Sequence, residues 1–142
     1  GMYKTEPAIA DGGQVIIYAP HVREVSVVHG RILDEVGYHC RDYFLEQWER
    51  FRGYPGGVLA HSTHVKGRGT YDRRTKTETP RIDVTLSTSI SRAASERVNL
   101  GYQDPATIDP ATWASRVDGR TLVVPHAGEH LFRVGKPPAP GE

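Results

Sequence analysis

Apolar and polar residues recur with different periods along the chain, and these periods predict its helices and strands. Val15–Ala19 is a continuous apolar run that follows a turn signal at residues 11–13 and ends at Pro20. A run of this length, rich in β-branched residues, is typical of a strand buried on both faces. Arg81–Ser87 instead alternates apolar with polar residues. That alternation predicts a strand with one buried face.

The strongest helical pattern runs from Ile32 to Phe51. Its apolar residues recur at spacings of three and four, and acidic and basic residues fill the opposite face. Gly37 lies inside this pattern, where glycine costs roughly 1 kcal/mol relative to alanine. We therefore expect Gly37 to allow close packing of the helix against a sheet.

Two shorter helices are predicted in the second half of the chain. The hydroxyl-rich residues 88–91 are suitable N-cap residues for a helix at Arg92–Val98. Asp109-Pro110 is typical of a helix start, because proline fits the first helical position, and it favours a helix at Ala111–Arg116.

Short apolar runs complete the predicted sheet. They are Val58–Ala60, Asn99–Tyr102, Thr121–Pro125 and His130–Val134. Residues 67–80 are polar, and we expect a loose exposed hairpin with residues 73–76 at its tip. Residues 135–142 have no apolar anchor, and we expect a disordered tail.

The order of these elements predicts the fold class. Buried short strands alternate with helices, as in α/β domains. We expect a layered α/β/α domain with a mixed, largely parallel, Rossmann-like sheet over residues 1–134, followed by the tail at 135–142. The 142 residues suffice for one domain with a real core. Gly1-Met2 resembles a tag remnant before an initiator methionine, so we expect the chain to be a piece of a longer protein.

Charge and cysteine content exclude several classes of partner. Eighteen basic and seventeen acidic residues give a formal net charge of +1, which indicates neither a nucleic acid nor a membrane partner. The single cysteine, Cys40, cannot form an internal disulfide. We expect it to be buried and unreactive, as suits a reducing cytoplasm. No segment has the length and hydropathy of a membrane-spanning helix.

The densest group of chemically useful residues follows the predicted second strand. It comprises His61, His64, Lys66 and Arg68. Polar residues beyond the carboxyl ends of strands line the ligand crevice of open α/β sheets. His21 follows the first predicted strand and would lie at the same edge if the two strands are parallel neighbours. This group predicts a crevice for a carboxylate or a phosphate, because Lys and Arg donate hydrogen bonds to anionic oxygens.

Less specific interpretations of these residues remain open. His61 or His64 could transfer a proton, contact a substrate, or serve only in packing. Residues three apart in a strand point to opposite faces, so we expect no metal site on this chain alone. The chain lacks a nucleophile elbow and a P-loop, and Glu78 and Asp83 form no recognisable carboxylate pair. A small independent hydrolase is therefore not supported.

Four segments resemble the C-terminal domain of the nickel-dependent lactate racemase family, in its branch of longer homologues. They are Met2–Pro7 (MYKTEP), Ala10–His21 (ADGGQVIIYAPH), Gly37–Phe44 (GYHCRDYF) and Leu59–Gly67 (LAHSTHVKG). The resemblance spans residues 2–134. It implies a two-domain enzyme whose N-terminal domain carries a lysine-tethered nickel-pincer nucleotide and the histidines that ligate nickel and move protons. The C-terminal domain then covers a 2-hydroxy acid or sugar acid and supplies polar contacts to it.

The resemblance does not include the parts of the family enzyme that carry out the reaction. The cofactor-bearing domain is absent from this chain, and so is a substrate lysine that the family places just before Gly1-Met2; Lys4 is no obvious replacement. We therefore expect the isolated chain to bind no cofactor and to be inactive without an N-terminal domain as partner. The alternative is a stand-alone binding or assembly module on the same scaffold. A domain without its partner exposes an interface, which a homodimer would cover.

Overall fold

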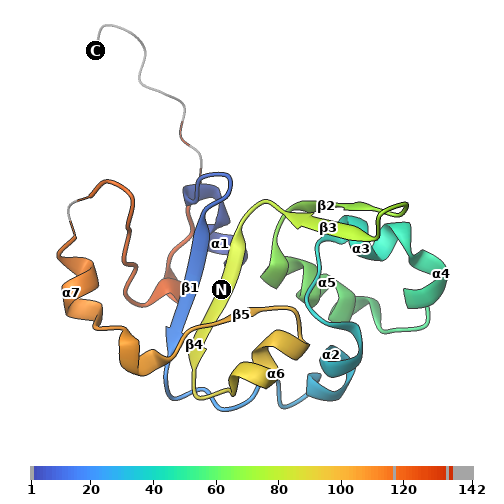
Figure 1. The fold of residues 1–142 in the computed structure, drawn as a ribbon, viewed down its shortest axis with the longest axis horizontal. Helices are drawn as coiled ribbons and strands as arrows, with labels where there is room; N and C mark the ends of the chain where they lie inside the picture. Colours follow the sequence, from blue (N-terminus) through green and yellow to red (C-terminus); the bar gives the residue numbers. More distant parts are fainter. Residues whose placement is uncertain (1, 117, 134, 136–142) are drawn as a thin grey trace, which may run out of the picture.

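The structure, a computed structural model, describes residues 2–116, 118–133 and 135. A three-stranded parallel sheet is flanked by helices and accompanied by a separate two-stranded antiparallel hairpin (Figure 1). The elements are α1 (Met2–Thr5), η1 (Glu6–Ala8), β1 (Gln14–Ala19), α2 (Gly30–Val36), α3 (Arg41–Glu46), α4 (Trp48–Phe51), α5 (Gly56–Lys66), β2 (Gly69–Asp72), β3 (Thr77–Pro80), β4 (Asp83–Thr88), α6 (Arg92–Arg97), β5 (Gly101–Tyr102), η2 (Pro105–Thr107), α7 (Pro110–Ala114) and η3 (Ala127–Glu129). This architecture confirms the predicted layered α/β fold with a mixed, largely parallel sheet.

The parallel sheet has the strand order β1-β4-β5. β1 pairs with β4 along its whole length, from Gln14 opposite Asp83 to Ala19 opposite Thr88. β5 is much shorter, and it pairs with β4 only at Thr85 and Leu86. The start of β4 therefore has a strand on one side and an opening on the other.

Burial differs between the two long strands because one is central and the other lies at an edge. Five of the six residues of β4 are buried. None of the residues of β1 is fully buried, and Tyr18 is 42% exposed. The predictions of a doubly buried first strand and a half-buried later strand were both wrong. Strand order, which the local pattern does not contain, decides which strand is covered on both sides.

The single helix predicted from Ile32 to Phe51 was wrong. The chain forms α2, α3 and α4 instead. Gly37 ends α2 with a φ of 70°, which L side chains rarely adopt. The extended residues that follow bring the Tyr38 N–H to within 2.9 Å of the Val98 carbonyl oxygen and bury Cys40 completely. A continuous helix could not place both residues in this way.

The strand predicted at Val58–Ala60 was also wrong, because this run lies in α5. The buried residues of α5 are Val58, Leu59, Ser62 and Lys66. This spacing of one, three and four positions is helical, and two of the buried residues are polar. A short apolar run is ambiguous between strand and helix, and the polar residues at buried positions concealed the helical period.

Other predictions at the level of elements were confirmed. The polar stretch 67–80 contains the hairpin β2–β3. Helix α6 begins after Ser91, whose Oγ accepts a hydrogen bond from the Ala94 N–H. Helix α7 begins after Asp109, whose carboxylate accepts from the Ala111 N–H. These elements are specified by turn and capping residues that act over a few positions, which a sequence pattern can show.

The strands predicted at Thr121–Pro125 and within residues 130–133 were wrong, since the described residues from 118 onward contain no strand. Local bonds hold part of this segment, such as the Thr121 N–H to the Asp118 carboxylate at 2.8 Å. Lys4 contacts the rest of this segment twice. Its ammonium donates to the Gly128 carbonyl oxygen, and its own carbonyl oxygen accepts from the Phe132 N–H. The three-stranded sheet formed by the described residues ends at β1, and this segment is not paired with it. Val134 and residues 136–142 of the predicted tail lie outside the described residues.

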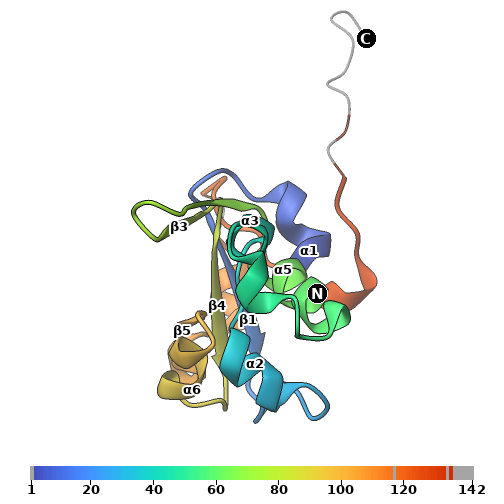
Figure 2. The ribbon, with the colours of Figure 1, turned by 90° about the vertical axis from the view of Figure 1, so that its right-hand side faces the viewer.

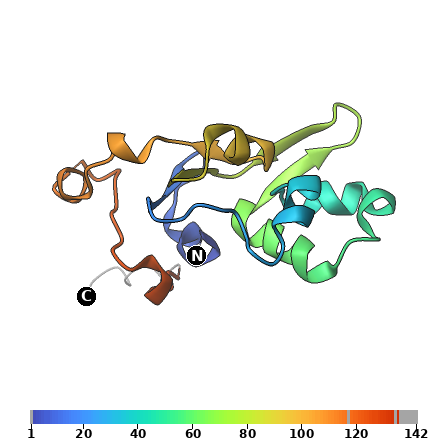
Figure 3. The same cartoon turned by 90° about the horizontal axis from the view of Figure 1, so that it is seen from below.

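The core lies between the sheet and the helices that precede β4. Figure 2 shows α1 and α5 on one side of β1 and β4, with α6 and β5 on the other. Seen from below, α7 lies at the opposite end of the molecule from α3 and α4 (Figure 3). Among the described residues, every buried apolar side chain belongs to the segment from Met2 to Leu100. None of the described helices is long and apolar enough to cross a membrane.

Candidate functional site

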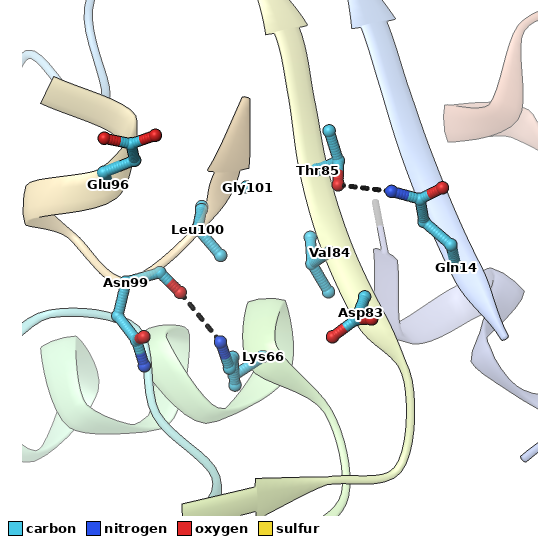
Figure 4. A pocket seen from close by; sticks show the side chains of 9 residues that line it. All are labelled: Gln14, Lys66, Asp83, Val84, Thr85, Glu96, Asn99, Leu100 and Gly101. Atoms are coloured by element: carbon cyan, nitrogen blue, oxygen red, sulfur yellow. Dashed lines mark hydrogen bonds between the residues drawn. The ribbon is translucent and has the colours of Figure 1, made fainter. Parts of the chain in front are cut away.

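A polar pocket of about 450 Å³ lies where β4 extends beyond the short strand β5 (Figure 4). The pocket is lined by Gln14, Lys66, Asp83, Val84, Thr85, Glu96, Asn99, Leu100 and Gly101. Gly101 must lack a side chain, because a Cβ atom there would lie 2.6 Å from the Thr85 hydroxyl oxygen. The opening therefore results from a truncated strand and from the close approach of β5 to β4.

Lys66 supplies the one ammonium group that the described residues place in this pocket. The residue is only 8% exposed, and Nζ donates a hydrogen bond of 2.8 Å to the Asn99 carbonyl oxygen (Figure 4). An ammonium has three donors, so two remain for a ligand or for water. Burial lowers the pKa of Lys66, while the carboxylates of Glu78 and Asp83 act in the opposite direction. An anionic oxygen is a chemically suitable acceptor for these donors.

Hydrogen-bond acceptors surround the rest of the pocket. Asp83 and Glu96 line it, both residues are exposed, and Glu96 Oε1 also accepts a hydrogen bond of 3.4 Å from Arg92. Gln14 donates to the Thr85 hydroxyl oxygen at 2.7 Å, and its amide oxygen has no donor among the described residues. One cation among several acceptors suits a ligand that carries both a carboxylate and hydroxyl groups.

A largely buried carboxylate, Glu78, lies behind the Asn99 wall of the pocket. Its side chain is 13% exposed and belongs to β3. The Cys40 N–H donates to Oε1 at 2.6 Å, and the Asn99 side-chain amide donates to Oε2 at 3.1 Å. His39 Nδ1 lies 2.7 Å from Oε2. Segments far apart in the sequence thus converge on a single carboxylate.

The Asn99 side-chain amide bridges the Tyr38 carbonyl and the Glu78 carboxylate beside His39. The Asn99 amide nitrogen lies 2.9 Å from the Tyr38 carbonyl oxygen and 3.1 Å from Glu78 Oε2. These two acceptors use both of its N–H groups. An ionised carboxylate only accepts hydrogen bonds, so the short contact between His39 and Glu78 is a bond donated by a protonated Nδ1.

Opposing effects act on the ionisation of Glu78. Burial raises the pKa of Glu78, but the hydrogen bonds from His39 and from the Cys40 N–H outweigh burial and hold this pKa below its ordinary value. Glu78 therefore stays ionised at neutral pH. Burial also raises the pKa of the Cys40 thiol to about 11, which agrees with the buried, unreactive thiol expected from the sequence.

The structure does not bring the five residues of the predicted crevice together. His61 and Lys66 lie on the same helix but reach different pockets. His61 Nε2 is 3.3 Å from the Tyr38 hydroxyl, and both residues line a mainly apolar pocket of about 210 Å³ at the carboxyl halves of β1 and β4. Burial raises the pKa of Tyr38 to about 12. Burial also lowers the pKa of His61, and electrostatic interactions with His29 and His64 lower it further.

The remaining three predicted residues lie elsewhere on the surface. His64 places its ring 5.3 Å from that of Tyr3 on α1. Arg68 donates its backbone N–H to Glu6 at 3.0 Å and is exposed. His21 is exposed in the turn after β1. The expected crevice assumed that His61 and Lys66 follow a strand, whereas in α5 they lie on different faces of a helix.

His39, Glu78 and Asn99 are the candidate residues that the sequence did not indicate. His39 appeared only inside a segment of family resemblance, and Glu78 appeared only as half of an absent carboxylate pair. Of the three, only Asn99 has a recognisable sequence feature, because asparagine after a helix favours the left-handed conformation that ends the helix. Asn99 has this conformation in the structure, with a φ of 62°. The pairing of His39 with Glu78 joins separate elements and has no local sequence pattern.

The described residues contain no group of three or more His, Cys, Asp or Glu side chains that could hold a metal ion. They therefore do not fit the nickel centre that the resemblance implies for a complete enzyme. The pocket itself offers an ammonium, two carboxylates, one hydroxyl and two side-chain amides.

Comparison with known proteins gives a structural relative but no function. No family model and no curated protein matches the sequence. The structure is similar to a crystal structure of a Thermotoga maritima protein from the Northeast Structural Genomics Consortium, with a TM-score of 0.81 and 32% sequence identity. The similarity covers 93% of this chain and 33% of that protein. The chain thus spans a third of the length of the protein that it matches.

Proposed function

We propose that this chain is the substrate-covering domain of a larger racemase- or epimerase-like enzyme that acts on a 2-hydroxy acid or a sugar acid. The observation that carries the proposal is Lys66, whose nearly buried ammonium opens into a polar pocket with donors to spare. The resemblance of residues 2–134 to the C-terminal domain of the lactate racemase family supports it. The match to one third of a longer protein also supports it, since that is the extent expected of one domain.

The pocket suits the two functional groups of such a ligand. A carboxylate would accept hydrogen bonds from Lys66, where burial strengthens the charge-assisted bond. Hydroxyl groups would donate to Asp83, Glu96 or the Gln14 amide oxygen, which are acceptors along the same pocket. A multiply charged anion such as phosphate would be repelled by the Asp83 carboxylate more strongly than a monocarboxylate would be. The acceptors therefore favour a hydroxylated acid over a bare anion.

In this proposal the N-terminal domain and this chain have different roles in the reaction. The nickel-pincer nucleotide, which supplies hydride abstraction and return, would be held by the N-terminal domain, and the described residues of this chain offer no ligand set for nickel. This chain's residues bind and orient the acid and exclude water from one side. Lys66 anchors the carboxylate and thereby fixes the position of the adjacent hydroxyl-bearing carbon.

Binding to the chain itself can be measured without the cofactor. We expect D-gluconate and D-lactate, titrated into ¹⁵N-labelled protein, to shift the amide signals of Asn99 and Gly101 saturably. Lys66→Met keeps the aliphatic stem but removes the charge, and we expect it to weaken binding at least about tenfold. Lys76→Met is the matched control, because Lys76 is exposed at the hairpin tip. Equal affinity in the wild type and Lys66→Met would contradict the proposal.

Turnover needs the second domain. We expect exchange of the carbon-bound hydrogen of a hydroxy or sugar acid only when this chain is co-expressed with a cofactor-loaded N-terminal domain. Lys66→Met in that assembly would lower the exchange rate while the thermal midpoint stays near that of the wild type. Binding of the acid without exchange in the complete assembly would instead favour the stand-alone binding module.

A further inference from the structure

A second pocket, of about 210 Å³, lies at the carboxyl ends of β1 and β4, whereas the Lys66 pocket lies where these strands begin. Two cross-strand pairs line this apolar pocket, Ile17 with Leu86 and Ala19 with Thr88. Figure 1 shows the arrowheads of β1 and β4 at the same edge of the sheet. Ligands of open α/β sheets bind beyond the carboxyl ends of parallel strands, so this position favours a ligand site.

The wall of the apolar pocket carries no positive charge that could hold an acid. Besides the strand residues, apolar side chains such as Val22, Val65 and Leu100 line it. Among the described residues that line it, none is a lysine or an arginine, and the one carboxylate is that of Glu24, which is exposed. An anion entering this pocket would lose hydration, gain no cation and approach Glu24. The apolar pocket therefore excludes the acids that suit Lys66.

Tyr38 and His61 form a hydrogen-bonded pair in the wall of the apolar pocket. The Tyr38 hydroxyl oxygen lies 3.3 Å from His61 Nε2, and the two rings meet edge to face with centroids 5.7 Å apart. Tyr38 is buried, whereas His61 is exposed. Burial keeps both groups uncharged at neutral pH, because it raises the pKa of Tyr38 and lowers that of His61.

This pair offers a ligand one donor and one acceptor in either direction of its hydrogen bond. If Tyr38 donates to Nε2, the phenol oxygen accepts and the Nδ1–H group of His61 donates. If Nε2 donates to Tyr38, the phenol O–H group donates and Nδ1 accepts. Neither side chain makes a further hydrogen bond among the described residues. A hydroxyl group, which both donates and accepts, suits either arrangement.

We propose that the apolar pocket binds a small uncharged alcohol or phenol with a single apolar ring. The ring contacts the strand residues, and the hydroxyl group bonds to the pair of Tyr38 and His61. The volume sets the size of the ligand: a protein cavity of about 150 Å³ accommodates benzene. The pocket of about 210 Å³ therefore accommodates one ring with a small substituent. This ligand differs in charge from the acid of the proposed function, and the two proposals do not depend on each other.

Titration of p-cresol and toluene into the ¹⁵N-labelled chain tests this site, because the two compounds differ only in the hydroxyl group. We expect p-cresol to shift the amide signals of Ala19 and Thr88 saturably and to leave that of Gln14, at the other end of β1, in place. Tyr38→Phe should weaken p-cresol binding about tenfold and leave toluene binding within about twofold. Tyr54→Phe is the matched control, because the Tyr54 hydroxyl is exposed and bonds to Glu35 instead.

A second variant blocks the space itself. Ala19→Leu fills the apolar pocket and should abolish binding of both compounds, and binding that survives would overturn the proposal. Equal loss of p-cresol and toluene affinity in Tyr38→Phe, or benzoate binding as tight as that of p-cresol, would also overturn it. If p-cresol shifts neither Ala19 nor Thr88, the site is refuted. The proposed function would still stand in that case, because it is measured separately by gluconate binding at Lys66.

Discussion

At the scale of single residues, two buried serines show how differently the same side chain can be used. Ser62 and Ser87 are both 0% exposed. Ser62 Oγ donates to the Gly37 carbonyl oxygen at 2.9 Å and accepts from the His39 N–H. Ser87 Oγ has no partner among the described residues. The first hydroxyl supports the loop that carries the site, whereas the second is a desolvated polar group without compensation.

These serines predict opposite effects of one substitution. We expect Ser62→Ala to lower the free energy of unfolding by about 1–3 kcal/mol, because it leaves a buried N–H and a buried carbonyl unpaired. Ser87→Ala removes an unpaired hydroxyl and should leave that free energy unchanged or raise it by about 1 kcal/mol. Urea denaturation followed by circular dichroism measures both. Equal destabilisation by the two variants would show that Ser87 has a partner after all.

The site itself was only partly predictable at this scale. Lys66 was identified from the sequence as a substrate-binding candidate, because a lysine among histidines and hydroxyls is a visible local cluster. His39 and Glu78 were not identified, because their bond connects the residue before α3 to the hairpin strand β3. Such a contact depends on tertiary packing, and neither residue has a distinctive neighbour in the sequence.

At the scale of elements, Gly37 decides how the first half of the chain folds. With its φ of 70° and ψ of −179°, it occupies a region that is open essentially to glycine alone. The turn it makes ends α2 and directs Tyr38, His39 and Cys40 into the core and the site. The helical pattern placed Gly37 inside one long helix at a cost in stability. In the structure, Gly37 is instead the residue at which α2 ends.

The same reasoning predicts the effect of a methyl group. Gly37→Ala should lower the free energy of unfolding by about 2 kcal/mol or more, from backbone strain and from contact with His39 Nε2. Gly57→Ala is the matched control, because Gly57 lies in α5 with nothing within 4 Å of a Cβ atom. That substitution should stabilise the chain by about 0.5–1 kcal/mol. Tolerance of alanine at Gly37 would favour the continuous helix that the pattern suggested.

At the scale of the whole molecule, the core and the peripheral segment are separate. No described residue after Leu100 is buried. The segment after α7 contacts the remainder through bonds to Lys4 that are largely exposed. Exposed apolar side chains such as Leu122 and Leu131, at 67% and 57%, lie in this segment. The described residues of this segment therefore contribute exposed surface to the molecule and no buried core residue.

A shortened chain tests this separation. We expect a chain that ends at Ser115 to unfold cooperatively and to lose less than about 1 kcal/mol of stability, because exposed hydrogen bonds contribute little. The denaturation midpoint in urea measures this, and the ligand titration shows whether the Lys66 pocket survives. Loss of cooperative unfolding would mean that residues beyond 115 contribute to the core.

The sequence by itself determined the fold class, the hairpin at 67–80, the caps at Ser91 and Asp109, and the buried state of Cys40. These features depend on composition and on interactions between residues a few positions apart, which local patterns contain. The tertiary structure alone decided that β4 is central, that residues 58–60 belong to a helix, and that Asn99 joins Lys66 to His39 and Glu78. Those outcomes depend on which segments become neighbours in space, and that choice is made by the packing of the whole chain.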